Sequence, residues 1–169
     1  MAERGPTSDA PRRRESALAA APVAALTAGV LLCVALFLLY RVPGNPPGFH
    51  HDEASLAYNA YTIAHTGRDQ DGGLLPLYLV SYKDYKSTPF VYLLTGLFAI
   101  VGPSVSAARE LGAALVLAAV VLLGWLAWRL TASLAVCLAV VALAATTPWL
   151  YELSRTAFEA VLEPAVLLL

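Results

Sequence analysis

Two groups of acidic side chains carry the functional groups best suited to proton transfer or metal binding. Asp52 and Glu53 are adjacent, and Glu159 and Glu163 lie four positions apart later in the chain. A carboxylate held in a fixed position can act as a general base. Asp52 and Glu53 also match the start of a helix, with Asp52 as the N-cap and Glu53 in the first turn, where acids favour the helix dipole. The catalytic and the capping interpretations are compatible, because an aspartate that caps a helix has a fixed orientation.

Two histidines directly precede the first acidic pair, in the run His50-His51-Asp52-Glu53. The H-E-x-x-H pattern of zinc proteases is absent from the sequence. Neighbouring residues of an extended segment point to opposite sides, so all four cannot bind one ion. We therefore expect at most one histidine and one carboxylate of this run in a divalent-metal site, which a distant acid would complete.

Basic side chains follow in the same part of the chain, at Arg68, Lys83 and Lys86. They either extend along the membrane surface to lipid headgroups or neutralise the charge of a phosphate during a reaction.

A third polar group, Arg155, Glu159 and Glu163, shares one face if these residues begin a helix. Arg155 and Glu159 would then form either a structural ion pair at the helix start or part of a functional site. Glu163 lies among apolar residues directly before Pro164, and acids at membrane depth are usually functional.

The composition places these residues in an integral membrane protein. The hydrophobic share is 59%, the charged share 14% and the mean hydropathy +0.66, whereas soluble domains average about 45–50% apolar and 25% charged residues. This excludes an ordinary soluble enzyme and a disordered protein, and the net charge of −1 excludes a nucleic-acid partner. Cys33 and Cys137 lie in apolar runs, which favours a role as small hydrophobic residues over a disulfide or metal clip.

Apolar runs define the segments that must position the polar residues. We interpret residues 1–16 as a flexible cytoplasmic tail and residues 17–40 as the first membrane helix, since the apolar run is too long for a signal peptide. The arginines before this helix place the N-terminus in the cytoplasm. We expect a first outer loop at 41–108, membrane helices at 109–130 and 132–150, a second outer loop at 151–163, and the start of a truncated fourth membrane helix at 164–169.

Within the first outer loop we expect a short surface helix over 53–66, with Asp52 as its N-cap and Gly67 as its end. Tyr58, Tyr61 and His65 would lie on its wet side.

The apolar run 89–101 is only 13 residues long, which favours an interfacial or re-entrant helix over a spanning one. If it does not span, Arg129 is cytoplasmic and both acidic groups face outward; if it spans, they lie on opposite sides. The positive-inside tendency of Arg129 favours the first topology.

The order of these segments resembles a known family. The run GFHHDEASLAYNAYTIAHTG follows the first helix, a lysine and then a proline precede the short apolar run, AARELGAALVLAAVVLLGWLAWRL forms the next helix, and LSRTAFEAVLEP comes after the one that follows it. Together they are similar to the N-terminal part of the family 39 membrane glycosyltransferases, a group close to the protein mannosyltransferases and the lipid A aminoarabinose transferase. The resemblance covers residues 17–169. It implies an all-α integral membrane protein, namely the N-terminal part of a GT-C type multi-helix bundle with short surface helices in its outer loop.

The same resemblance implies roles for individual residues. Asp52 matches the catalytic base that activates the acceptor, and Glu53 matches its partner acid. Lys86 resembles a lysine that contacts the lipid phosphate of the donor, although Ser87 and Thr88 separate it from Pro89.

Further positions complete the expected site. Arg155 is expected, with His51 and Lys86, to bind substrate or phosphate. Glu159 follows Arg155 in an arginine-x-x-x-acid pattern, and Glu163-Pro164 matches an alternative pattern, so either acid is a candidate for the second acidic or metal site.

These implications predict a multi-pass cell-membrane glycosyltransferase. It would move a sugar from a polyprenyl-phosphate-linked donor to a hydroxyl of an acceptor protein, lipid or glycan at the outer face, with a divalent metal ion as its only candidate cofactor. We expect the fragment to be inactive alone, because later helices would supply the rest of the cavity. The alternative is a fragment of a multi-pass transporter or channel whose acids bind ions, but the polar residues concentrate in an outer loop, which favours an enzyme.

Overall fold

The computed structural model describes the backbone of residues 9–81 and 84–168, and the side chains of 21–80 and 85–168. The described chain is mostly helical, as the sequence predicts. Its elements in order are α1 (Asp9–Leu39), the 3₁₀ turn η1 (Val42–Gly44), α2 (His51–Thr66), β1 (Tyr78–Ser81), β2 (Asp84–Ser87), α3 (Pro89–Val101), α4 (Val105–Thr131), α5 (Leu134–Thr146), α6 (Pro148–Leu153), η2 (Glu159–Leu162) and α7 (Glu163–Val166).

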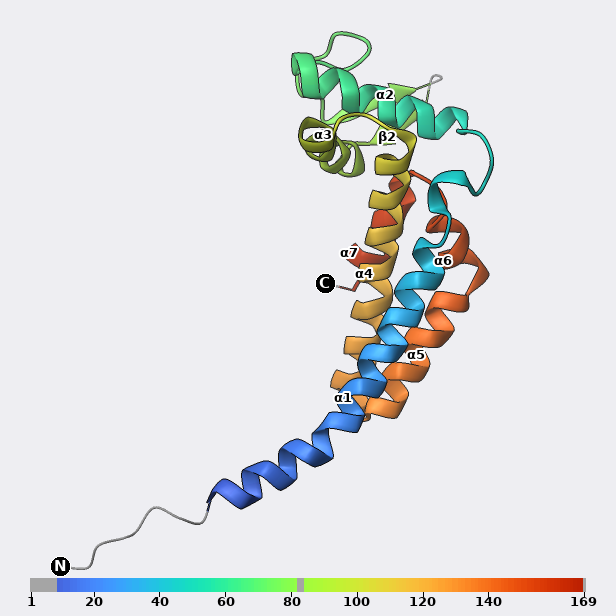
Figure 1. The fold of residues 1–169 in the computed structure, drawn as a ribbon. Coiled ribbons are helices and arrows are strands. Elements are labelled where there is room, and N and C mark those ends of the chain that lie inside the picture. The colour runs from blue at the N-terminus through green and yellow to red at the C-terminus, as the bar shows by residue number, and fades with distance from the viewer. Residues whose placement is uncertain (1–8, 82–83, 169) are drawn as a thin grey trace, which may run out of the picture.

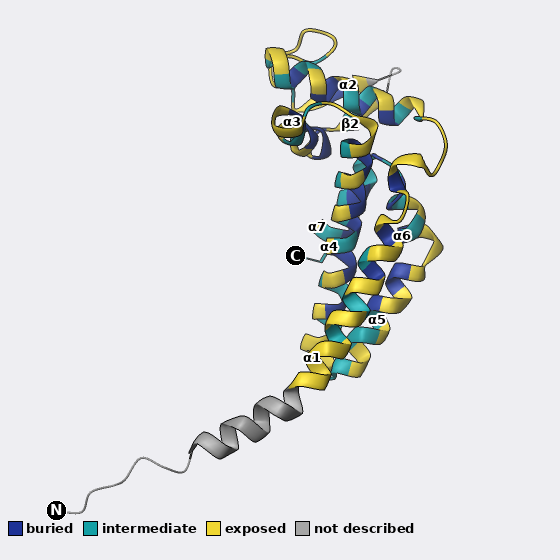
Figure 2. Ribbon diagram, in the orientation of Figure 1, coloured by how far each residue is buried: buried dark blue, intermediate teal, exposed yellow. Residues whose placement is uncertain are grey.

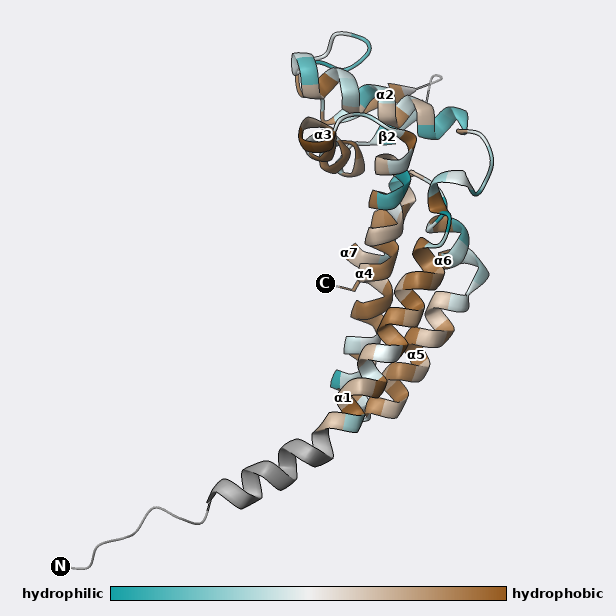
Figure 3. Ribbon diagram, viewed as in Figure 1, coloured by the Kyte–Doolittle hydropathy of each residue, from teal (hydrophilic) through white to brown (hydrophobic). Residues whose placement is uncertain are grey.

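Helices α1, α4 and α5 run side by side as an elongated bundle, and α2, α3 and the β1–β2 hairpin cover one end of it (Figure 1). Two segments are long and apolar enough to cross a membrane, Ala21–Gly44 and Val105–Thr131. The bundle is apolar along its length, and hydrophilic residues gather toward the covered end (Figure 3). Many of its apolar side chains are exposed (Figure 2), among them Leu26, Leu32, Leu36 and Leu143.

Small residues on α4 set how closely the other elements approach it. A Cβ at Gly124 would clash with a methyl group of Val141 on α5, so these helices pack in direct contact there. A Cβ at Gly112 would lie 2.6 Å from the carbonyl oxygen of Thr156. Glycine at position 112 therefore lets the chain after α6 lie against the N-terminal half of α4.

The end of the bundle is built around a packed pair of short helices. Helix α3 contacts α2, and the apolar side chains between them are buried, including Leu56 and Ile63 of α2 and Phe90 and Leu94 of α3. Gly67 ends α2 as predicted, because it adopts φ 70°, a conformation that glycine tolerates best. The antiparallel hairpin β1–β2 pairs Leu79 with Lys86, and this small sheet departs from the all-α expectation.

Three predicted boundaries are wrong. Residues 9–16, predicted as a flexible tail, belong to α1, because proline is tolerated in a first turn and the following residues favour helix; residues 1–8 lie outside the described part of the chain. Helix α4 begins four residues before the predicted start, at Val105, with the hydroxyl of Ser104 as its cap. The predicted helix 132–150 is broken at Thr147, which is extended (ψ 125°) because the residue before a proline avoids the helical region.

Thiol labelling tests which side of a membrane each end of the bundle occupies. In a background with Cys33 and Cys137 replaced by alanine, Asp71→Cys and Ser106→Cys place exposed thiols on either side of α3 in the sequence. Both should react with an impermeant maleimide in intact cells, whereas Leu130→Cys at the other end of α4 should react only after permeabilisation. Labelling at position 71 without labelling at 106 would mean that α3 crosses the membrane.

Candidate functional site

A buried ion pair between Glu53 and Arg109 joins α2 to α4. Their side chains are 2% and 1% exposed. The guanidinium donates two parallel hydrogen bonds to the carboxylate, from Nε to Oε1 (2.9 Å) and from Nη2 to Oε2 (2.8 Å). Its remaining N–H groups donate to the carbonyl oxygens of Pro43, Pro46 and Gly48 in the loop between α1 and α2. All five donors of the guanidinium are therefore used.

The carboxylate of Glu53 has two further partners. It accepts hydrogen bonds from the backbone N–H of His50 (3.0 Å) and of Ala157 (2.9 Å), so its oxygens accept four in all. Ala157 lies between α6 and η2, far from α2 in the sequence. One carboxylate thus holds the start of α2, the N-terminal part of α4 and the chain after α6 together.

These contacts keep Glu53 ionised. Burial raises the pKa of its carboxyl group. The hydrogen bonds from Arg109, Ala157 and His50 lower the pKa by more than burial raises it, so the pKa lies below the ordinary value of 4.5. A carboxylate with a lowered pKa and no remaining lone pair is a poor proton acceptor. The hydrogen bonds of Glu53 fix the start of α2, where Asp52, the other acid of the expected catalytic pair, is located.

The start of α2 differs from the predicted one, because His50 and not Asp52 is the N-cap. His50 is extended, its Nδ1 accepts the N–H of Asp52 (3.4 Å), and Glu53 reaches back to the N–H of His50. This is the capping-box pattern, with histidine in the place usually taken by serine or threonine. Asp52 therefore lies in the first turn, and its side chain is available for contacts beyond α2.

Asp52, Lys86 and Glu159 meet beside this helix start. Lys86 Nζ lies 3.7 Å from Asp52 Oδ1 and 3.8 Å from Glu159 Oε1. These separations are those of ion pairs rather than short hydrogen bonds. The Lys86 side chain is 12% exposed, and its ammonium lies 5.4 Å from the ring centroid of Phe158. Three residues that the sequence singled out, from α2, β2 and η2, thus form one charged cluster.

A pocket of about 400 Å³ adjoins this cluster. Glu159 and Glu163 contribute its acidic groups, and the other lining residues are Ser87, Pro89, Leu162, Val166 and Leu167. Both candidate second acids therefore face the same pocket, and the ion pair of Glu159 with Lys86 connects this pocket to Asp52.

Arg155 occupies a different place from the predicted one. It is 3% exposed, and its guanidinium donates to the carbonyl oxygens of Phe37 and Tyr40 at the end of α1 while lying over the ring of Tyr151 (4.4 Å). It therefore caps α1. The expectation of one helix face over 155–163 is wrong, because Phe158 is extended and interrupts the chain before η2.

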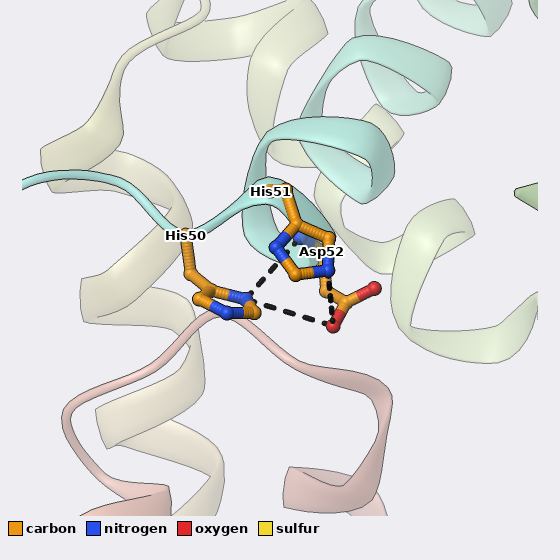
Figure 4. A group of neighbouring side chains, drawn as sticks. All are labelled: His50, His51 and Asp52. Carbon is orange, nitrogen blue, oxygen red and sulfur yellow. Dashed lines mark hydrogen bonds and ion pairs between the residues drawn. The ribbon is translucent and has the colours of Figure 1, made fainter. Parts of the chain in front are cut away.

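His50, His51 and Asp52 converge at the surface (Figure 4). Oδ2 of Asp52 lies 3.6 Å from Nδ1 of His50 and 3.5 Å from Nε2 of His51. The expectation that neighbouring side chains in this run diverge is wrong, because residue 51 already begins the helix. Glu53 points instead toward Arg109, in the interior.

Sequence reasoning gave Arg109 no role. The signal was present, since an arginine within the first turns of an otherwise apolar helix requires a partner.

Comparisons with models of protein families, with curated proteins and with solved structures find no match for this chain. The site geometry is therefore the basis for assigning a function.

Replacing Glu53 with glutamine tests the buried ion pair. The variant keeps the side-chain size but leaves the Arg109 charge buried without its counter-ion, a change that typically costs about 3–5 kcal/mol. The melting temperature in detergent, followed by circular dichroism, should fall strongly for Glu53→Gln and stay near the wild-type value for the exposed neighbour variant Glu110→Gln. Similar melting of both variants would contradict the central role of the pair.

The lowered pKa of Glu53 also predicts a pH dependence of stability. The ionised carboxylate stabilises the folded protein above its ordinary pKa of 4.5, and this contribution disappears as the pH falls through the lower folded-state pKa. Melting temperatures measured from pH 7 to pH 3.5 should therefore fall more steeply for the wild type than for Glu53→Gln. Parallel curves would show that Glu53 does not titrate as an ion-paired group.

Proposed function

We propose that this chain is part of a multi-pass membrane glycosyltransferase of the GT-C type, which uses a polyprenyl-phosphate-linked sugar as its donor. The observation that carries the proposal is the cluster of Asp52, Lys86 and Glu159 beside a largely apolar pocket. The cluster offers a carboxylate and a cation at the polar end of a bundle of spanning-length helices. The sequence resemblance points to the same residues.

The cluster supplies the two functions that such a transfer needs. The acceptor hydroxyl oxygen attacks the anomeric carbon of the sugar, the bond from that carbon to the phosphate oxygen breaks, and the hydroxyl proton goes to Asp52. Lys86 stabilises the negative charge that develops on the leaving phosphate. Glu53 does not take the proton, because its four hydrogen bonds commit it to holding Asp52 in place.

We assign the second acid of the site to Glu159, because it pairs with Lys86, whereas Glu163 lines the same pocket from α7. Lys86 supplies positive charge where the sequence predicted that Glu159 or Glu163 would hold a divalent metal ion. Glu159 and Asp52 hold the Lys86 ammonium between two carboxylates, beside the pocket that Glu159 lines.

The pocket and the bundle suit a lipid donor. Pro89, Leu162, Val166 and Leu167 give the pocket apolar walls that an isoprenoid chain can contact. The exposed apolar side chains of the bundle suit a bilayer, in which burying them is favourable. With a cytoplasmic N-terminus, the cluster would lie at the outer face of the cell membrane, where a lipid-linked donor can meet a protein, lipid or glycan acceptor.

The geometry favours an enzyme over a transporter or channel. Ion pathways through membranes are lined by polar or charged side chains facing the bundle interior. The bundle segments 21–39, 112–128 and 134–146 contain no charged residue, and the charged cluster lies at the end of the bundle.

Asp52→Asn tests the proposed base. The variant keeps the size and the capping contacts of the helix start, because the cap is His50. Loss of a general base typically lowers a rate by about 10²–10⁴-fold, so membranes containing the full-length protein with this substitution should transfer labelled sugar from a polyprenyl phosphate at least a hundredfold more slowly than membranes with the unsubstituted full-length protein. Asp71→Asn, an exposed aspartate in the same outer segment, is the matched control. Activity of Asp52→Asn within a few-fold of wild type would remove Asp52 from the mechanism.

Lys86→Gln tests recognition of the lipid phosphate. A hydrogen bond to a charged group contributes about 1.5–3 kcal/mol, which corresponds to roughly a tenfold or greater effect on affinity. Undecaprenyl phosphate should therefore bind the purified variant at least tenfold more weakly than the wild type. Arg129→Gln, at the far end of α4, should bind it normally. Equal affinity of Lys86→Gln and wild type would contradict the assignment.

A further inference from the structure

We propose that His50, His51 and Asp52 form a binding site for a transition-metal dication, for which Zn²⁺ is the best-suited ion. The site lies on the histidine side of the Asp52 carboxylate, and Lys86 pairs with the other carboxylate oxygen. It uses both histidines of this run, where the sequence predicted at most one histidine and one carboxylate completed by a distant acid, and it is distinct from the candidate metal site at Glu159 or Glu163.

The ligand atoms are already close to a binding arrangement. Oδ2 of Asp52 is 3.6 Å from Nδ1 of His50 and 3.5 Å from Nε2 of His51, and all three atoms lie within 4.8 Å of one another. In a tetrahedral zinc site with bonds of about 2.0–2.2 Å, ligand atoms are roughly 3.3 Å apart. Both histidine side chains are 60% exposed, so a small rotation of an imidazole brings the two nitrogens together.

The donor set selects the class of ion. Two imidazole nitrogens and one carboxylate suit Zn²⁺, Cu²⁺ or Ni²⁺, whereas Mg²⁺ and Ca²⁺ prefer oxygen ligands. Three protein ligands leave a fourth position for water or for a substrate oxygen. Glu53 stays outside the set, because its oxygens are held by Arg109 and by two backbone N–H groups.

Two features disfavour the binding of a cation at this site, the nearby positive charge and the cap bond of His50, and the geometry reduces the effect of each. The N-terminus of α2 and the ammonium of Lys86 are positive, but Lys86 pairs with Oδ1, the oxygen that does not face the histidines. Nδ1 of His50 accepts the cap bond from the Asp52 N–H at 3.4 Å, which is long for a hydrogen bond. Metal binding would replace that bond, and the other half of the capping box, from His50 N–H to Glu53, would remain.

Occupancy of this site would regulate the reaction, an inference that rests on the proposed function. A metal ion at Oδ2 would occupy the carboxylate oxygen on the histidine side and would leave less of the Asp52 carboxylate accessible to an acceptor hydroxyl. Zn²⁺ would therefore slow sugar transfer, and removal of the ion by a chelator would restore it.

Zinc titration of the purified protein tests the site without any transfer assay. With the full chain in detergent and without a polyhistidine tag, calorimetry with zinc chloride should find one ion per chain. His51→Ala, and His50→Asn, which retains a capping side chain, should each weaken binding at least tenfold. His65→Ala is the matched control, because His65 is exposed on the same helix but bonds to the carbonyl oxygen of Tyr61, and magnesium chloride is the control ion.

Thermal melting gives a second readout. Zinc should raise the melting temperature of the wild type and of His65→Ala but not that of His51→Ala, because an ion that binds only the folded state stabilises it. Equal zinc affinity of the wild type and His51→Ala, or equal binding of magnesium, would overturn the site. If zinc binds as expected but transfer is unaffected, the site stands and its regulatory role fails; if no transfer is found at all, the binding result still decides the site.

Discussion

The structure at the polar end of this protein depends on the need to satisfy one buried arginine. Arg109 lies near the start of the long apolar helix α4, and a buried guanidinium there must find partners for all five of its N–H groups. It finds them in Glu53 and in three carbonyl oxygens of the loop after α1. The carboxylate of Glu53 also accepts a hydrogen bond from the backbone N–H of Ala157, which holds the chain after α6. Segments that are far apart in the sequence are thus fixed to one another.

In this arrangement the two adjacent acids have different partners: Glu53 pairs with the buried Arg109, and Asp52 pairs with Lys86. Successive residues of a helix point about 100° apart, so when Glu53 turns inward to Arg109, Asp52 faces the neighbouring elements. Asp52 then meets Lys86 from the hairpin and, through Lys86, Glu159 from η2. A carboxylate with four hydrogen bonds holds the geometry, and a neighbour that remains accessible supplies the reactive group. The proposed transferase mechanism and the proposed zinc site both depend on that exposed side of Asp52.

The chain after α6 is held against the bundle by Arg155 and by the space that Gly112 of α4 leaves. Arg155 caps the last carbonyls of α1, and Gly112 lets the backbone of Thr156 lie directly against α4. Both features fix the path of the chain that delivers Glu159. An arginine used in this way is withdrawn from the surface, which explains why a residue expected to bind phosphate lies buried beneath the site.

The sequence by itself predicted a mostly helical, apolar chain, the helix end at Gly67, and a set of candidate side chains that includes Asp52, Lys86 and Glu159, with Glu163 left as the alternative to Glu159. These follow from apolar run length, glycine conformation and the chemistry of side chains, all of which are local. The sequence did not predict the His50 cap, the β1–β2 hairpin, the break at Thr147 or the burial of Arg155. Only the tertiary structure decided which of two adjacent acids is buried and which cation reaches them. The physical reason is that hydrogen bonds such as Glu53–Arg109 and Glu53–Ala157 join residues far apart in the chain, and their partners become defined only when the helices pack.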